Sequence, residues 1–340
     1  MHALLDLPET LIPVQAFLAD QIIEVERRFD AQLASELPPV ADLCAHIERY
    51  RGKMLRPTLV LLCGLATSKN PDQRELTPDH ITLAAVTEMV HMATLVHDDV
   101  LDSADTRRRG LTVNKLRGNE AAVILGDYLI ASSFHLCSQT GTCEASLVVG
   151  RASTAMCAGE LLQLHNRENF SIDEPTYEEI VRRKTGALIG AACRLGALAS
   201  DADPELCDDL ESFGISLGAA FQIQDDLLDL TGRERIVGKS VGQDAKTGKL
   251  TLPVIHHLVE ATTKQRSATM ALLIRLAHSW TAPDAEELAT ALEATGSIDH
   301  ARDQARRRVD EAVACLTRLP QSNARELLEL LAQAVVDRSF

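Results

Sequence analysis

The chain is made of long segments with apolar residues at helical spacing, and few residues interrupt them. Between residues 81 and 96, for example, apolar side chains recur every three or four positions, as they do on the buried face of a helix. No segment shows the alternating pattern of a half-buried strand. Only 3% of the residues are aromatic, although sheets favour aromatic and β-branched side chains. We therefore predict an all-α fold.

The length of 340 residues is compatible with two domains of ordinary size or with one large helical domain. No repeat of fixed period divides the chain, apart from one short acidic motif. We predict a single domain over residues 1–340, with a helical extension at 1–40, the functional motifs at 51–253 and further helices at 254–340. Thr176 followed by Glu179 fits a capping box, so we expect a helix over 177–198 that begins just after Pro175.

The formal net charge of -15 argues against a nucleic acid or an anionic membrane as the partner, because both require an excess of Lys and Arg. Every stretch long enough to span a membrane carries charged residues, and the first ten residues are acidic where an export signal would be basic. None of the eight cysteines belongs to a CxxC pair, so we expect buried, reduced thiols rather than zinc ligands or disulfides. We predict a cytoplasmic protein without a transmembrane segment.

The acidic motif DDxxD occurs twice, at residues 98–102 and 225–229. Because positions i and i+4 share a face of a helix, the first and last carboxylates of each motif form a pair, while the second lies about 100° round the helix. The two sets are the first aspartate group, Asp98, Asp99 and Asp102, and the second aspartate group, Asp225, Asp226 and Asp229.

Both aspartate groups lie in apolar sequence, where like charges at this spacing destabilise a helix and unpaired carboxylates are costly to bury. A hard divalent cation removes this conflict. Carboxylates without His or Cys suit Mg²⁺, which commonly joins one or two carboxylates to the phosphates of a substrate. The alternative, two solvated acidic helix ends, does not explain the basic residues that accompany the acids.

Basic residues are clustered at a few places in this acidic chain. They are Lys53 and Arg56, the run Arg107-Arg108-Arg109, Lys184, and Lys239 and Lys249 in a glycine-rich stretch. Carboxylates, Mg²⁺ and these cations together suit a substrate with a diphosphate or triphosphate. The stretch Gly238-Lys239-Ser240 lacks the GxxxxGK[ST] pattern and follows no strand, which disfavours nucleotide hydrolysis by a P-loop.

These motifs, in this order, resemble those of the all-trans polyprenyl diphosphate synthases, head-to-tail prenyltransferases of isoprenoid biosynthesis that include farnesyl and geranylgeranyl diphosphate synthases. The matching blocks are Arg51 to Pro57, His91 to Asp102, Arg107-Arg108, Asn114, Gly118-Asn119, Gly126-Asp127, Gly159-Glu160, Lys184-Thr185, Gly218 to Asp226 and Gly238 to Pro253. The resemblance implies the isoprenoid synthase fold, a large helical bundle around a central active-site cavity. It also implies a homodimer.

The resemblance further implies a role for each matching residue. The allylic diphosphate would be held through Mg²⁺, three ions in all, by the six aspartates. Around it would lie Arg107, Lys184, Thr185, Gln222, Lys239 and Lys249, of which Lys184, Thr185 and Gln222 would also assist catalysis. Isopentenyl diphosphate would bind without metal on Lys53, Arg56, His91 and Arg108. This division is reasonable physically, because only the diphosphate that leaves needs Lewis-acid metals.

The chain departs from the family pattern at two places. Arg51 replaces the first glycine of its block, which would strain the backbone if that position required a positive φ. Arg109-Gly110-Leu111 replaces the usual Gly-x-Pro after the two arginines. The second departure raises the question of which two of the three arginines reach the phosphates. Counting from the flanking motifs favours Arg107 and Arg108.

The length of the product depends, in the family, on bulky residues one or two turns before the first aspartate group. Here Val90, Ala93 and Thr94 occupy these positions, and none is aromatic. We therefore predict a medium- to long-chain product, such as a quinone side chain, with Phe134 as a candidate floor of the channel. A short-chain farnesyl or geranylgeranyl diphosphate synthase is the nearest alternative. A class I terpene cyclase and a non-catalytic partner subunit are disfavoured, because the acidic motif is duplicated and all six aspartates are present.

Overall fold

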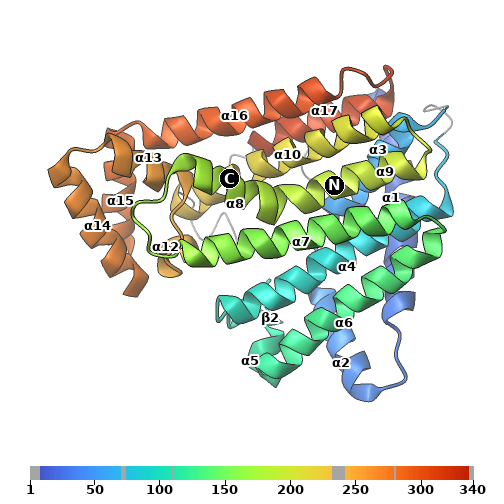
Figure 1. The fold of residues 1–340 in the computed structure, drawn as a ribbon, viewed down its shortest axis with the longest axis horizontal. Helices are drawn as coiled ribbons and strands as arrows, with labels where there is room; N and C mark the ends of the chain where they lie inside the picture. Colours follow the sequence, from blue (N-terminus) through green and yellow to red (C-terminus); the bar gives the residue numbers. More distant parts are fainter. Residues whose placement is uncertain (1–7, 70–73, 109, 232–241, 279–280, 337–340) are drawn as a thin grey trace. The chain divides into compact units, whose positions relative to one another are not determined.

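The computed structural model describes residues 8–69, 74–108, 110–231, 242–278 and 281–336, and these are almost entirely helical (Figure 1). The helices are α1 (Ile12–Leu33), α2 (Pro38–Ile47), α3 (Leu55–Thr67), α4 (Pro78–Leu101), α5 (Val113–Arg117), α6 (Asn119–Cys137), α7 (Cys143–His165), α8 (Glu174–Val181), α9 (Ala187–Ala199), α10 (Pro204–Thr231), α12 (Gln243–Lys246), α13 (Leu252–Glu260), α14 (Thr263–His278), α15 (Ala282–Ala294), α16 (Ser297–Cys315) and α17 (Asn323–Val336). The all-α prediction is confirmed.

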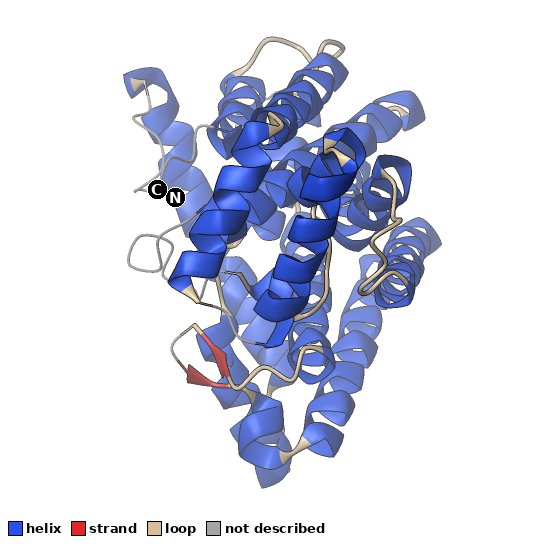
Figure 2. Ribbon diagram, turned by 90° about the vertical axis from the view of Figure 1, so that its left-hand side faces the viewer, coloured by secondary structure: helices blue, strands red, loops and turns tan. Residues whose placement is uncertain are grey.

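A two-stranded ribbon, which the sequence analysis did not predict, is the only sheet among the described residues (Figure 2). Strands β1 (Thr106–Arg107) and β2 (Gly110–Leu111) pair antiparallel, with Arg107 opposite Gly110. Two residues per strand are too few for an alternating pattern to appear in the sequence. The ribbon matters because it carries two of the predicted substrate-binding arginines.

The contacts divide the chain into two compact units. Unit 1 comprises Met1–Ser153, Leu188–Gly214 and Cys315–Leu331, and unit 2 comprises Thr154–Ala187, Ile215–Ala314 and Ala332–Phe340. The single domain over residues 1–340 stays a prediction.

The core of unit 1 is formed by α1, α3, α4 and α6. Helix α3 is buried from Pro57 to Ala66, and α4 is buried on most of its faces. Glycines allow close approach: a Cβ on Gly196 of α9 would lie 2.1 Å from the carbonyl oxygen of Val60. Helix α1, in the predicted N-terminal extension, buries Val14, Leu18 and Val25 and contacts α3 and α4. It is therefore an integral part of the core of unit 1.

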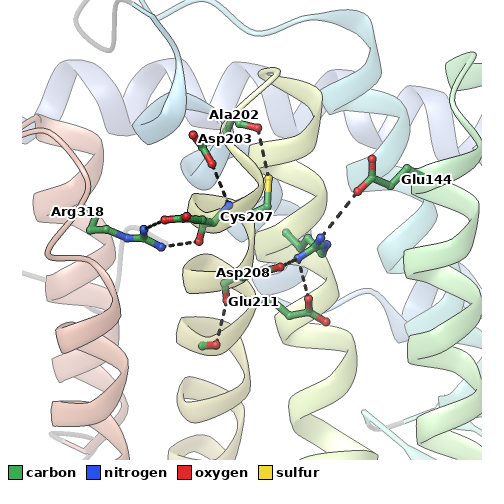
Figure 3. Close-up of polar contacts among 10 residues, drawn as sticks. Glu144, Ala202, Asp203, Cys207, Asp208, Glu211 and Arg318 are labelled. Atoms are coloured by element: carbon green, nitrogen blue, oxygen red, sulfur yellow. Dashed lines mark hydrogen bonds and ion pairs between the residues drawn. The ribbon is translucent and has the colours of Figure 1, made fainter.

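Two arginines tie helices of unit 1 together through carboxylates (Figure 3). Arg194 of α9 contacts Asp208 and lies 3.1 Å from Glu211, both on α10. Arg318 binds Asp209 and, at 2.5 Å, Glu205. The Arg194 side chain is only 11% exposed, so its ion pairs are less screened by solvent than ordinary surface pairs.

Unit 2 has its own apolar core, built mainly by α13, α14, α15 and α16. Leu258, Leu272, Leu276, Leu288 and Leu292 are all at most 5% exposed. Because these helices meet through leucines at helical spacing, they follow the pattern read from the sequence.

The segment predicted as one helix over 177–198 has a different organisation. Asp173 is the N-cap of α8, and its side chain accepts a hydrogen bond from the backbone N of Thr176 at 3.0 Å. Pro175 lies inside the first turn, where its missing N–H would be unpaired in any case. The helix then widens into a π-helical turn at Arg182–Gly186 before α9. The predicted capping box at Thr176 is therefore wrong.

Helix α6 lies in the segment Asn119–Thr140, which is long and apolar enough, by length and composition, to cross a membrane. It is the one such segment in the described part of the chain, and 44% of its most apolar window is buried. A core helix meets the same criterion, and the packing of α6 against α4 accounts for its apolar side.

All eight cysteines are free thiols, as predicted, and five are buried, whereas Cys143 and Cys157 are exposed.

Candidate active site

The first aspartate group lies at the C-terminal end of α4, in unit 1. Asp98 and Asp99 belong to the last turn, and Asp102 caps the helix, with its backbone N donating to the carbonyl oxygen of Asp98 at 2.9 Å. The predicted pairing of Asp98 with Asp102 across one turn therefore agrees with the backbone. These two side chains are partly exposed, whereas Asp99 is 1% exposed.

Asp99 is held by the β-ribbon that follows it. Arg107 Nε and Nη2 lie 2.8 Å and 2.7 Å from Oδ1 of Asp99, and Asn114 Nδ2 donates to the carbonyl oxygen of Asp99 at 3.1 Å. The Arg107 guanidinium also lies over the ring of Tyr50. Burial, followed by the nearby Asp99 carboxylate, raises the pKa of the Tyr50 hydroxyl to about 12. This network fixes Arg107 and the loop beside the aspartates.

A cluster of predicted substrate-binding residues surrounds the middle of α4. Burial lowers the pKa of His91 well below its usual value, and the charges of Arg56, Arg107 and Arg108 lower it further. His91 is therefore a neutral imidazole among three cations. Nε of Arg56 is buried without a hydrogen-bond partner among the described residues, which leaves one donor of this guanidinium for a ligand.

Glu88 is the buried counter-charge of this cluster, and the sequence analysis missed it. It is 3% exposed. Burial raises the pKa of its carboxyl group, while Arg56, Arg108 and Arg51 oppose that effect. A signal was present in the sequence, since Glu88 is a charged residue in an apolar helix and lies three positions before His91, on the same face.

The structure answers the first of the two questions raised by the departures from the family pattern, the one about Arg51. Arg51 has φ -57°, so it needs no glycine; its side chain pairs with Asp30, and its guanidinium lies over the ring of Phe29. A Cβ on Gly52 would lie 2.4 Å from Nη2 of Arg108. The absence of a side chain at Gly52, which is next in sequence to the exposed Lys53, therefore leaves room for the Arg108 guanidinium. Arg107 and Arg108 are both engaged at the cluster, and Arg109 lies outside the described residues.

The second aspartate group lies on α10, in unit 2, and a chain of hydrogen bonds joins it to other predicted residues. Thr185 Oγ1 donates to Oε1 of Gln222 at 2.8 Å, and Nε2 of Gln222 donates to Oδ1 of Asp226 at 2.8 Å. The hydroxyl of Tyr177, on α8, donates to Oδ2 of Asp226 at 2.6 Å. Both oxygens of Asp226, which is 4% exposed, therefore accept hydrogen bonds from the protein.

Lys184 and Thr185 are placed by the π-helical turn between α8 and α9. Nζ of Lys184 donates to Oε1 of Gln163 at 2.8 Å and forms an ion pair with Glu160, both on α7. The turn approaches α7 at Gly159, where a Cβ would lie 2.8 Å from the backbone N of Lys184. Single π-turns occur often at functional sites, because the extra residue redirects side chains.

Asp229 ends the second group and connects to the described segment that begins at Gly242. Its carbonyl oxygen accepts from the backbone N of Gly242 at 2.9 Å, and its Oδ2 accepts from the backbone N of Asp244 at 3.1 Å. The backbone N of Lys249 donates in turn to the carbonyl oxygen of Asp244 at 2.9 Å. Lys249 is thus tied to the aspartates through the backbone, and Lys239 lies outside the described residues.

The predicted chain-length residues differ in their surroundings. Val90 and Ala93 are 0% exposed. Thr94 is partly exposed, and its hydroxyl donates to the carbonyl oxygen of His91 at 2.7 Å. Since His91, Thr94 and Asp98 recur at helical spacing and are all partly exposed, they share one face of α4. Phe134 is partly buried, with its ring edge 4.0 Å from a Cβ built on Gly150.

The residues of both aspartate groups fit Mg²⁺. Each motif offers carboxylate oxygens alone, the donor that Mg²⁺ prefers. Oδ2 of Asp99 is buried and has no hydrogen-bond partner among the described residues, as expected of an oxygen that faces a cation or its bound water.

Tyr177 is a site residue that the sequence analysis did not predict. Only the fold brings its hydroxyl to Asp226.

Comparison with known proteins finds similarity over almost the whole chain. The family polyprenyl synthetase matches residues 38–288. A protein named heptaprenyl diphosphate synthase component 2, from Geobacillus stearothermophilus, is 34% identical over 328 residues, which are 96% of this chain and 98% of that protein.

Solved structures agree with this result. A decaprenyl diphosphate synthase from Rhodobacter capsulatus has a TM-score of 0.85 at 35% identity, covering 95% of this chain and 97% of that one. A geranylgeranyl pyrophosphate synthetase from Pyrococcus horikoshii Ot3 has a TM-score of 0.84 at 30% identity, covering 96% and 100%. Proteins named for products of different length thus share this fold.

Proposed function

The chain belongs to the polyprenyl synthetase family, and on that basis we propose that it condenses isopentenyl diphosphate with an allylic diphosphate, head to tail, to give an all-trans polyprenyl diphosphate. The observation that carries the proposal is the combination of two carboxylate-only groups with a separate cluster of arginines around a neutral histidine. The first suits a diphosphate bound through Mg²⁺, and the second suits a diphosphate bound without metal.

We propose that the partly exposed Asp98, Asp102, Asp225 and Asp229 hold the Mg²⁺ ions of the allylic diphosphate. When bound, Mg²⁺ acts as a Lewis acid that stabilises the departing diphosphate. The buried Asp99 and Asp226 have other protein partners, Arg107 for the first and Tyr177 with Gln222 for the second. Their main role is to orient the aspartate groups, and Oδ2 of Asp99 would be available to help hold the ion.

Two more sets of residues complete the proposed mechanism. Lys53, Arg56, His91 and Arg108 bind isopentenyl diphosphate, and the neutral His91 contributes a hydrogen bond rather than a charge. Lys184, Lys239 and Lys249 bind the leaving diphosphate, while the Thr185 hydroxyl and the Gln222 amide stabilise the allylic carbocation with their dipoles. The double bond of isopentenyl diphosphate attacks that cation, and loss of a proton to the departing diphosphate gives the new trans double bond.

We propose a medium- to long-chain product. The support is the small side chain of Thr94 on the face of α4 that carries Asp98, and the absence of an aromatic residue at positions 90, 93 and 94. Each added unit buries more apolar chain at about 0.8 kcal/mol per methylene, so growth ends where a bulky residue blocks it, for which Phe134 is the candidate. Relatives named heptaprenyl and decaprenyl diphosphate synthases support this choice over a short-chain product.

The test is an incubation of the purified full chain with Mg²⁺, labelled isopentenyl diphosphate and a short allylic primer. We expect elongated products whose number of five-carbon units defines the chain length. No elongated product would contradict the proposal, and a cyclic hydrocarbon made from the primer alone would indicate a terpene cyclase.

We also propose a cytoplasmic homodimer. Eight free thiols fit a reducing compartment, and Val123 and Ile124 of α6, 41% and 66% exposed, provide apolar surface for a second copy. Sedimentation equilibrium at several concentrations would reveal a monomer if this is wrong.

A further inference from the structure

Two histidines and a glutamate meet in unit 2, outside every residue to which the proposed function gives a role. Glu174 begins α8, His256 lies in the middle of α13, and His300 lies in the first turn of α16 (Figure 1). One ligand atom from each residue lies within 4.8 Å of the other two. Three helices therefore contribute one potential metal ligand each.

The geometry of this triad is close to that of a metal site. Nε2 of His300 lies 3.1 Å and 3.3 Å from the two carboxylate oxygens of Glu174. Two ligands of a tetrahedral Zn²⁺ with bonds of 2.0 to 2.1 Å lie roughly 3.3 Å apart, so this pair needs little movement. The rings of His256 and His300 stack with centroids 4.0 Å apart and an interplanar angle of 19°, so the two imidazoles lie side by side.

Two hydroxyl groups, those of Ser297 and Thr295, form a chain of hydrogen bonds that orients His256. Its Nδ1 lies 2.9 Å from Oγ of Ser297, which is 0% exposed and lies 2.7 Å from Oγ1 of Thr295. When Nδ1 donates to Ser297, Nε2 carries the lone pair that a metal requires, an arrangement typical of ligating histidines.

The three side chains are also accessible to an ion from solution. The His300 side chain is 26% exposed and that of Glu174 is 31% exposed. Two imidazoles and one carboxylate suit Zn²⁺ or a similar transition ion rather than Mg²⁺, which prefers oxygen ligands. The triad thus differs in chemistry from both aspartate groups.

We propose that Glu174, His256 and His300 form a Zn²⁺ site, completed by water, that ties the start of α8 to α13 and α16. Its role is structural, since the ion cross-links three helices of unit 2. The bound ion would also stabilise α8, which carries Tyr177, the residue whose hydroxyl donates a hydrogen bond to Asp226.

The test titrates Zn²⁺ into the full chain in the presence of excess Mg²⁺, which occupies the oxygen-only sites, and follows heat release and Tm. We expect one tightly held Zn²⁺ per chain and a Tm that rises with Zn²⁺ concentration. His256→Gln and His300→Gln should each weaken binding at least about tenfold. His278→Gln is the matched control, because His278 is an exposed histidine of α14, whose Nδ1 lies 2.8 Å from the carbonyl oxygen of Ile274 in the same helix.

Co²⁺ provides a readout independent of stability. We expect visible d–d absorption from Co²⁺ bound to the unmodified chain, and its loss in His256→Gln. If a histidine variant fails to fold by circular dichroism, Glu174→Gln serves in its place. The proposal is overturned if Zn²⁺ does not bind, or if it binds the folded variants with unchanged stoichiometry and affinity. Either result would mean that the triad is only an ion pair with a stacked ring. None of these readouts depends on prenyl transfer.

Discussion

At the scale of single residues, Glu88 and Tyr177 show how buried groups position the side chains that meet substrate. Glu88 is the carboxylate among Arg51, Arg56 and Arg108, and Tyr177 donates to Asp226. Neither belongs to a sequence motif, because each acts through contacts made only when the chain folds. The motif residues themselves could be predicted, since their types and spacing follow from the chemistry of metal and phosphate binding.

Replacing Glu88 by Gln tests its positioning role. Without the charge, Arg56 and Arg108 lose a nearby buried counter-charge, and a buried polar group left without its partner costs roughly 1 to 3 kcal/mol. We expect the KM for isopentenyl diphosphate to rise about tenfold, since 1.4 kcal/mol corresponds to a factor of ten, while the KM for the allylic substrate stays nearly constant. Steady-state kinetics with each substrate varied in turn measures this, and Glu88→Asp should restore part of the loss. An equal rise in both KM values would indicate general damage instead.

Tyr177→Phe removes one hydroxyl from the second aspartate group. Loss of a hydrogen bond that orients a metal-binding side chain commonly costs about 10-fold to 100-fold in metal affinity or activity. We expect the Mg²⁺ concentration for half-maximal activity to rise at least about tenfold, with little change in the far-ultraviolet circular dichroism. Tyr128→Phe, on α6, is the matched control. If both variants respond alike, Tyr177 has no special role at Asp226.

At the scale of elements, the helices follow from the spacing of apolar residues, but their irregular turns do not. The π-turn at Arg182–Gly186 meets α7 at Gly159, and Arg107 of strand β1 binds Asp99 of α4. The π-turn depends on α7, which offers Gly159 at the point of closest approach. A glycine in a helical pattern indicates that another element approaches the helix closely at that position, but the sequence does not identify that element.

Two glycines of α7 allow a matched comparison. A Cβ on Gly159 would lie 2.8 Å from Cβ of Arg183 and from the backbone N of Lys184, whereas a Cβ on Gly150 would meet nothing nearer than 4.0 Å. Gly150→Ala should raise the free energy of unfolding by roughly 0.5 to 1 kcal/mol, because alanine favours the helix. Gly159→Ala should lower it by roughly 1 to 3 kcal/mol and reduce kcat by displacing Lys184. Urea unfolding and steady-state kinetics measure both. If Gly159→Ala and Gly150→Ala raise the free energy of unfolding equally, the π-turn must shift to make room for the methyl group at position 159.

At the scale of the whole molecule, the acidic balance has a clearer meaning than the sequence alone allowed. Of 49 acidic residues, six belong to the aspartate groups, whose repulsion ends when Mg²⁺ and a diphosphate bind. Many others are neutralised within a unit, as Arg194 and Arg318 show (Figure 3). The net charge therefore disfavours polyanionic surfaces as partners, while the arginine cluster still suits a small diphosphate. Composition alone could predict that polyanionic partners are disfavoured, but only the fold shows where the cations lie.

The length of the product is a property of the whole molecule, and Thr94 offers the sharpest test of it. Because Thr94 is partly exposed on the Asp98 face of α4, a tyrosine there can project along that face without displacing the core. We expect Thr94→Tyr to remain active and to shorten the product by at least one five-carbon unit. Ala93→Tyr should shorten it as well, but Ala93 is 0% exposed, so overpacking should lower the free energy of unfolding by roughly 1 to 3 kcal/mol. Chromatography of the dephosphorylated products measures the length. An active Thr94→Tyr enzyme with an unchanged product would mean that the growing chain does not pass this face of α4.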